Sequence, residues 1–113
     1  MSKTRIGIVG YGNLGRGVEA AVAQNPDMDL VTLFTKRDPA TLTTATDGLA
    51  VHHMDDLDGY DGLIDVLVLC GSSKGDLPEQ TPALARRFSV VDSFDTHAEI
   101  PEHFAAVDAA ALE

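Results

Sequence analysis

Three glycines at fixed spacing are the first residues of the chain whose pattern implies chemistry. They lie in Gly10-Tyr11-Gly12-Asn13-Leu14-Gly15, between the apolar run 6–9 and a stretch with helical periodicity. Gly10 would allow a tight turn, Gly12 would let a diphosphate approach the backbone, and Gly15 would let the helix pack closely on the strand. Backbone N–H groups at a helix start are unpaired and attract anions. The motif predicts a dinucleotide-binding loop; the alternative is a glycine-rich turn that binds nothing.

Three polar residues follow the second predicted strand, residues 30–34, where dinucleotide-binding folds select the ribose. A site for NAD usually has an acidic residue here, which accepts a hydrogen bond from the ribose 2′-hydroxyl. This chain has Thr35-Lys36-Arg37, and the nearest acid, Asp38, comes after them. A 2′-phosphate would be repelled by a carboxylate but bound by these donors, and Arg37 could also stack on adenine. The pattern predicts NADP, although a solvated charge pair on a loop would have the same sequence.

A later strand end carries small polar residues that could complete a nucleotide site. The apolar run 66–70 leads into Cys70-Gly71-Ser72-Ser73, which is rich in donors and suited to lie against ribose or diphosphate. A solvent-exposed turn would have the same composition, so both interpretations stay open. Cys70 closes a buried strand with no base nearby in the sequence. We therefore expect its thiol to pack in the core and not to act as a nucleophile.

The next strand end reads Asp92-Ser93-Phe94-Asp95-Thr96-His97. An aspartate here could bind a substrate ammonium group, or it could cap the turn before Pro101, and spacing does not separate these roles. His97 stands alone, and a lone histidine is usually structural. His52 and His53 are adjacent and would point to opposite faces of a strand, so we predict no metal site.

The hydrophobic pattern predicts the scaffold that positions these residues. Short apolar runs alternate with helical periodicity, and in the first helical stretch Leu14, Val18, Ala21 and Val22 share one face. This alternation predicts parallel β-α-β units. With right-handed crossovers they form a doubly wound, mainly parallel α/β sheet of the Rossmann type, in three α-β-α layers. The predicted strands are residues 6–9, 30–34, 49–52, 66–70 and 89–92, and the predicted helices are 13–24, 78–87 and 101–111.

Composition restricts the partners and the compartment. The 113 residues carry 18 acidic and 8 basic side chains, a net charge of −10 that disfavours nucleic acids and anionic membranes. A single cysteine permits no intrachain disulfide, and the N-terminal apolar run is too short for a signal peptide, so we expect a cytoplasmic protein. The length fits one domain, residues 1–113. The end, Ala109-Ala110-Ala111-Leu112-Glu113, suggests an engineered truncation with a tag scar at 112–113.

Four segments together resemble the meso-diaminopimelate dehydrogenase family. They are Arg5-Ile6-Gly7-Ile8-Val9-Gly10-Tyr11-Gly12-Asn13-Leu14-Gly15-Arg16, Pro26-Asp27-Met28-Asp29-Leu30-Val31, Asp76-Leu77-Pro78-Glu79-Gln80 and Asp92-Ser93-Phe94-Asp95-Thr96-His97. The resemblance covers nearly the whole chain and is weak between residues 38 and 62. It implies the NADP-binding domain of a longer, homodimeric oxidoreductase of lysine biosynthesis. That enzyme would oxidatively deaminate the D-centre of meso-2,6-diaminopimelate to L-2-amino-6-oxopimelate, releasing ammonia and NADPH.

The resemblance also implies roles for individual residues. Residues 11–14 would contact the diphosphate, Thr35-Lys36-Arg37 the 2′-phosphate and adenine, and Asp95 would also face the amino group of the substrate. Two positions depart from the family pattern: Lys36 stands where arginine is common, which would weaken NADP binding, and Phe94 stands where tyrosine is common. The expected cofactor-binding residues are Gly10, Tyr11, Gly12, Asn13, Leu14, Gly15, Thr35, Lys36, Arg37, Cys70, Gly71, Ser72, Ser73, Ser93, Phe94 and Asp95.

Members of this family are much longer, so the catalytic groups, the other substrate contacts and the dimer interface are expected outside these residues. We therefore expect the chain alone to bind NADP without turning over substrate, because hydride transfer needs a substrate carbon held beside the nicotinamide. Two other functions are compatible with the glycine loop. One is another NADP-linked oxidoreductase of aspartate-family or sugar metabolism, and the other is a stand-alone dinucleotide sensor.

Overall fold

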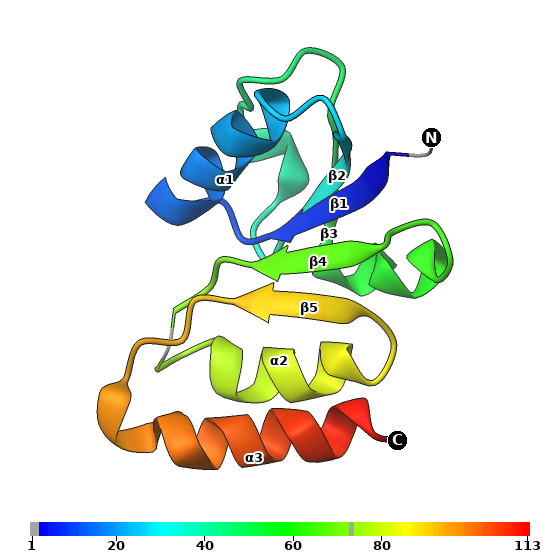
Figure 1. Cartoon of the computed structure of the whole chain (residues 1–113). Coiled ribbons are helices and arrows are strands. Elements are labelled where there is room, and N and C mark those ends of the chain that lie inside the picture. Colours follow the sequence, from blue (N-terminus) through cyan, green and yellow to red (C-terminus); the bar gives the residue numbers. More distant parts are fainter. Residues whose placement is uncertain (1–2, 73) are drawn as a thin grey trace.

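The computed structural model describes residues 3–72 and 74–113, and in these residues the chain forms five strands and three α-helices. The strands pair in parallel in the order β3-β2-β1-β4-β5 (Figure 1). From β1 the chain runs outward to β3, then returns to place β4 on the other side of β1. This arrangement confirms the predicted doubly wound α/β fold of the Rossmann type. The strands are β1 (Thr4–Val9), β2 (Met28–Thr35), β3 (Ala50–His53), β4 (Val66–Leu69) and β5 (Ser89–Asp92).

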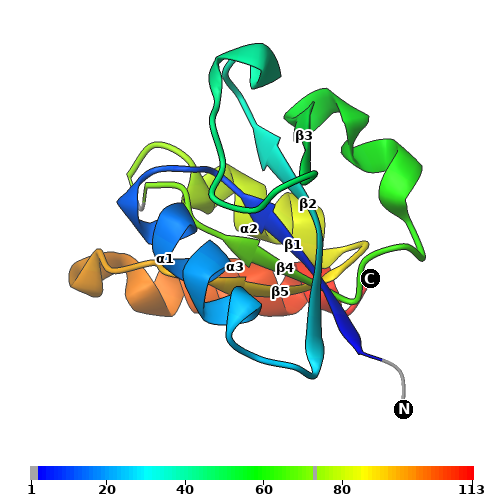
Figure 2. The ribbon, with the colours of Figure 1, turned by 90° about the horizontal axis from the view of Figure 1, so that it is seen from above.

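Helices cover both faces of the sheet. On one face α1 (Asn13–Ala23) packs beside β1 and β2, and on the other α2 (Leu77–Ala85) packs on β5 and on α3 (Ile100–Ala111) (Figures 1 and 2). Because β2 and β5 are reached in opposite directions across the sheet, right-handed crossovers place their connecting helices on opposite sides. None of the helices in the described ranges is long and apolar enough to cross a membrane. Short 3-10 segments lie at Pro39–Thr41 (η1), Met54–Tyr60 (η2) and His97–Glu99 (η3).

Among the residues that the structure describes, the core consists of two clusters, one on each face of the sheet. Ile8 and Leu33 are fully buried and pack with Tyr11, while Val9 and Phe34 belong to the cluster that includes Leu77 of α2. Neighbouring residues of one strand thus face opposite clusters, as the two-residue period of a strand requires. Full burial of a side chain of this size contributes roughly 1.5–3 kcal/mol. The run of β1 from Ile6 to Val9 is covered on both faces, whereas on β4 Leu67 and Leu69 are fully buried and Val66 and Val68, on the opposite face, are only half-buried.

The buried face of α1 differs from the predicted one. The apolar face predicted from spacing contains Leu14, but the Leu14 side chain is 46% exposed, and the buried residues of the helix are Gly15, Glu19 and Val22. Gly15 is buried because the helix lies against the Gly10 carbonyl at that residue. Glu19 is buried because its carboxylate turns inward to accept hydrogen bonds from the Tyr11 hydroxyl and the Thr46 N–H. Hydrophobicity alone did not indicate either interaction, so the apolar face predicted from spacing coincides only in part, at Val22, with the buried face of the helix.

Candidate functional site

The glycine loop joins β1 to α1 through contacts that only glycine permits. Gly10 has a φ of +94°, in the region that favours glycine, and its N–H donates to the Phe34 carbonyl at 2.9 Å. A Cβ added to Gly15 would lie 2.3 Å from the carbonyl oxygen of Gly10. Any side chain at Gly15 would therefore push α1 away from β1, as the sequence predicts for the third glycine of the motif.

The start of α1 offers unpaired donors beside open space. Gly12 is the N-cap residue, and in the part of the chain that the structure describes no side chain caps the helix and no acidic residue lies in its first turn. A Cβ built on Gly12 would meet no described atom within 4 Å. The first-turn N–H groups and the positive end of the helix dipole therefore suit a diphosphate, and the expected ligand fits this loop.

Tyr11 and Glu19 fix the loop from behind. The Tyr11 side chain is 4% exposed, and its hydroxyl donates to Glu19, which also accepts from the backbone N–H groups of Thr46 at 2.9 Å and Ala45 at 3.4 Å. Burial raises the pKa of Glu19, but the hydrogen bonds from Thr46, Tyr11 and Ala45 outweigh it, so the pKa lies below its ordinary value. The buried carboxylate thus ties the glycine loop to the β2–β3 connection.

A cleft of about 220 Å³ lies at the carboxyl ends of β1, β2 and β4. This is where strand order reverses, the place at which ligands bind in open α/β sheets. Residues from three predicted segments meet in its walls: the glycine loop, the end of β2 and the end of β4. The predicted site residues that line it are Gly10, Tyr11, Gly12, Thr35, Lys36, Arg37, Cys70, Gly71 and Ser72.

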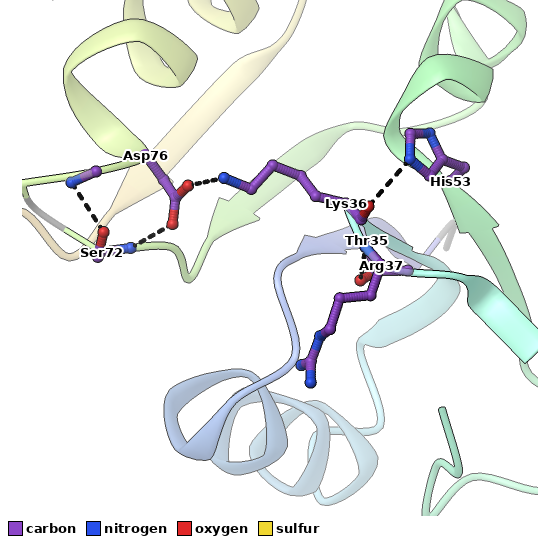
Figure 3. A network of polar contacts seen from close by, with 7 residues as sticks. Thr35, Lys36, Arg37, His53, Ser72 and Asp76 are labelled. Atoms are coloured by element: carbon purple, nitrogen blue, oxygen red, sulfur yellow. Dashed lines mark hydrogen bonds and ion pairs between the residues drawn. The ribbon is translucent and has the colours of Figure 1, made fainter. Parts of the chain in front are cut away.

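The two adjacent cations of the cleft point in different directions (Figure 3). Arg37 reaches the glycine loop, where its guanidinium donates to the Tyr11 carbonyl at 3.2 Å. Lys36 extends to the opposite wall and forms an ion pair with Asp76. Thr35 is buried, and its hydroxyl accepts from the backbone N–H of Arg37 at 3.0 Å. The three residues therefore line one cleft from the end of β2. The charge of Arg37 lies on the side of the glycine loop, and the charge of Lys36 lies on the side of Asp76.

His53 supports this strand end and was missed by sequence reasoning. Its Nδ1 accepts from the backbone N–H of Asp55 at 3.1 Å, and its Nε2 lies 3.1 Å from the carbonyl oxygen of Lys36. A proton on Nε2 satisfies both contacts, so the neutral ring can donate to Lys36 (Figure 3). The ring thereby links β3 to the turn that carries the cations. An adjacent histidine pair carried no signal of this backbone contact.

Asp76 and Gln80 are two further cleft residues without a predicted individual role. One oxygen of Asp76 accepts from the Ser72 backbone N–H at 2.9 Å, and the other pairs with Lys36 (Figure 3). The hydrogen bond from Lys36, followed by that from Ser72, lowers the pKa of Asp76 below its ordinary value. Gln80 lines the cleft one helical turn later, and its buried Oε1 has no hydrogen-bond partner among the described residues. The signal available for both was their place in the segment Asp76-Leu77-Pro78-Glu79-Gln80.

The segment after β5 lies outside the lining of the cleft. Ser93 donates from its hydroxyl to the Leu69 carbonyl at 3.5 Å, and Phe94 stacks on His103 with ring centroids 4.0 Å apart. Asp95 is exposed. Three other expected cofactor residues, Asn13, Leu14 and Gly15, form the first turn of α1 and are not part of the cleft lining. Ser73 lies outside the described residues.

Cys70 lines the cleft with a half-buried thiol. Burial raises the pKa of this thiol to about 11, so the sulfur keeps its proton at neutral pH and is a poor nucleophile. Its backbone N–H donates to the Val9 carbonyl at 2.7 Å, which extends the pairing of β4 with β1 into the cleft. Within residues 3–72 and 74–113, no group of three or more His, Cys, Asp or Glu residues is arranged to hold a metal ion.

Comparison with known proteins finds relatives that are similar to nearly the whole chain. No family model matches it. Over 111 residues, 98% of the chain, it is 61% identical to a meso-diaminopimelate D-dehydrogenase of Ureibacillus thermosphaericus. Over nearly its whole length the chain is similar to meso-diaminopimelate D-dehydrogenases. It spans about a third of the length of these relatives, 34% in this case, and the resemblance predicted from its four segments is confirmed.

Solved structures of two dehydrogenases have the same fold as the chain. An engineered D-amino acid dehydrogenase bound to NADP⁺ superposes with a TM-score of 0.88 and 44% identity, over 96% of this chain and 33% of that protein. The Corynebacterium glutamicum DAP dehydrogenase in complex with DAP superposes with a TM-score of 0.86 and 43% identity, over 97% of this chain and 33% of the enzyme. The Rossmann-type architecture of the chain is thus that of these dehydrogenases.

Proposed function

We propose that the chain binds NADP in the cleft at the ends of β1, β2 and β4, and that residues 1–113 are the dinucleotide-binding domain of a longer oxidoreductase. The observation that carries the proposal is that the glycine loop and Thr35-Lys36-Arg37 line one cleft at the reversal of strand order. The NADP⁺-bound relative with the same fold supports the choice of cofactor.

Each wall of the cleft would hold a different part of the nucleotide. The glycine loop and the first turn of α1, residues 10–15, would bind the diphosphate through backbone N–H groups. Thr35, Lys36 and Arg37 would bind the 2′-phosphate and the adenine. Cys70, Gly71 and Ser72 would lie along the ribose and diphosphate, and Ser93, Phe94 and Asp95 would extend the site toward the nicotinamide. NADP, when bound, would supply the hydride acceptor.

The reaction of the longer enzyme would be oxidative deamination of meso-2,6-diaminopimelate at its D-centre. With NADP⁺ and water it would yield L-2-amino-6-oxopimelate, ammonia, NADPH and a proton, as a step of lysine biosynthesis. Sequence identity of 61% to a meso-diaminopimelate D-dehydrogenase and the fold shared with a DAP-bound enzyme support this substrate. Asp95 would contact the substrate's amino group, and segments beyond this chain would supply catalysis and a homodimer interface. The enzyme would act in the cytoplasm.

Titration of NADP and NAD against the 113-residue chain by calorimetry tests the cofactor. We expect NADP to bind at least about tenfold more tightly than NAD, because charge-assisted hydrogen bonds to the 2′-phosphate are strong. Arg37→Ala should remove most of this preference. Arg86→Ala is the matched control, because Arg86 pairs with Glu113 and does not line the cleft. Equal affinities for NADP and NAD in the wild-type chain would overturn the proposed cofactor.

Incubation of the chain with NADP and meso-diaminopimelate tests how much of the activity it carries. We expect no NADPH absorbance to develop, because the chain spans only a third of its relatives and hydride transfer depends on a held substrate. A longer chain that included the rest of a relative's length should turn over. Turnover by the 113 residues alone would show that the catalytic groups lie within them.

A further inference from the structure

An acidic residue lies in the cleft at the place proposed for an anion. Asp76, from the turn before α2, forms an ion pair with Lys36 from the end of β2, and the pair spans the two walls of the cleft (Figure 3). The Lys36 side chain is 62% exposed, whereas that of Asp76 is 19% exposed. The pair is therefore accessible from the cleft mainly on the lysine side.

Asp76 is the fixed member of this pair. Its second carboxylate oxygen accepts from the Ser72 backbone N–H at 2.9 Å, and a Cβ on Gly71 would lie 2.6 Å from the Asp76 Cβ. The aspartate is thus packed tightly against the turn that follows β4. Lys36 is attached through a long, flexible and mostly exposed side chain, so it can exchange partners while Asp76 stays in place.

The two nucleotides should respond to this carboxylate in opposite ways. A 2′-phosphate must compete with Asp76 for Lys36 and is repelled by the negative charge. An unphosphorylated ribose carries a 2′-hydroxyl that can donate to a carboxylate, as it does in sites that select NAD. Asp76 therefore opposes the preference that Lys36 and Arg37 create.

We propose that Asp76 is a specificity-determining residue that limits the preference of this cleft for NADP over NAD, by holding Lys36 in competition with the 2′-phosphate. The proposal rests on the proposed NADP site and deepens it. It assigns opposite effects to two groups of one ion pair. Loss of Lys36 should lower the NADP/NAD affinity ratio, and loss of the Asp76 charge should raise it.

Asp76→Asn is the first variant, because asparagine keeps an oxygen that can accept from Ser72 while it removes the charge. We expect the NADP/NAD affinity ratio to rise about fivefold, as Lys36 becomes available to the phosphate. Asp29→Asn is the matched control, since Asp29 is exposed on β2 and outside the cleft lining, and the same change in net charge there should leave the ratio unchanged. Asp76→Ser, which also lacks the charge, should change the ratio in the same direction.

If Asp76 had a purely structural role, its loss would weaken the binding of NADP and of NAD equally and leave the NADP/NAD affinity ratio unchanged. An unchanged or lower ratio in Asp76→Asn would therefore overturn the proposal. In the background Lys36→Met, the gain from Asp76→Asn should shrink to at most about twofold, because the competition for Lys36 is absent. A full gain in that background would also overturn it. If the wild-type chain bound neither nucleotide, the proposed function itself would fail, which is a distinct result.

Discussion

The middle of the sheet and its β5 edge differ in how completely the surface beside them is built. Around β1 and β2, residues from three strand ends converge on one cleft, and Tyr11 and Glu19 brace its loop from behind. Beyond β5, Phe94 borders a separate hollow of about 250 Å³ with Ile100 and Phe104, and the Phe104 side chain is 69% exposed. The residues proposed to bind the cofactor therefore meet in one cleft within the described chain, whereas the segment proposed for substrate lies beside exposed apolar surface.

A polar group nevertheless organises the second region. Asp92 accepts from the Thr81 hydroxyl at 2.8 Å and lies 2.7 Å from His103 Nε2, so it links β5 to α2 and α3. Desolvation raises the pKa of Asp92, but the hydrogen bonds from His103 and Thr81 lower this pKa by a larger amount. The pKa of Asp92 is therefore below its ordinary value. This carboxylate stabilises the position of helices, and Glu19 stabilises the position of a ligand loop.

Gly15→Val should have the largest effect, and it acts on the first region. The side chain would overlap the Gly10 carbonyl, whose oxygen would be 2.3 Å from the new Cβ, so α1 must move or the fold must loosen. We expect a loss of about 3 kcal/mol in the free energy of unfolding and loss of NADP binding. Urea unfolding and calorimetry measure both.

Gly17→Ala is the control in the same helix. A Cβ on residue 17 would meet no described atom within 4 Å. We therefore expect the free energy of unfolding to rise by up to about 1 kcal/mol and NADP binding to stay unchanged. If both glycine variants changed the free energy of unfolding and NADP binding equally, the close packing of Gly15 on the Gly10 carbonyl would not be the cause of the Gly15→Val effect.

Glu19→Gln should have the next largest effect. In either orientation the amide nitrogen of glutamine would face a backbone N–H, that of Thr46 or that of Ala45, and leave it unsatisfied, at a cost of about 2 kcal/mol in the free energy of unfolding. Because the folded-state pKa of Glu19 is lowered, the stabilisation by its carboxylate is present above the unfolded pKa and is lost as the pH falls through the folded pKa. The stability difference between wild type and variant should therefore narrow in acid. A constant difference from neutral to acid pH would exclude ionised Glu19 as its source.

Asp92→Asn should have the smallest effect of the three and separates the two regions. We expect a loss of about 1 kcal/mol in the free energy of unfolding, because one charge-assisted hydrogen bond is weakened while the side-chain shape is kept. The NADP/NAD affinity ratio should not change, since Asp92 does not line the cleft. A changed ratio would show that the region beyond β5 also contributes to nucleotide selection.

The sequence was sufficient to predict the elements and the main walls of the cleft. Spacing of glycines and alternation of apolar runs are local signals, and they placed Gly10, Gly12 and Gly15 correctly. The ion pair of Lys36 with Asp76 joins residues separated by 40 positions, and no local pattern encodes such a contact. Burial of Glu19 was equally hidden, because a glutamate on a helix is usually solvated and its partners lie in a distant loop. The prediction was poorest between residues 35 and 60, where β3 pairs with β2 through contacts that no local pattern encodes.

The central position of β1 has a consequence for how the chain folds. β1 lies between β2 and β4, and its pairing partners in β4 come about 60 residues later, as in the register of Ile6 with Val66. Contacts of such long sequence separation form late and slow the folding of a domain. The glycine loop can turn early, but its opposite wall appears only after β4 has docked. In a refolding experiment, nucleotide binding should therefore appear only when β4 has paired with β1. This step should come well after the first rise of the helical circular dichroism signal.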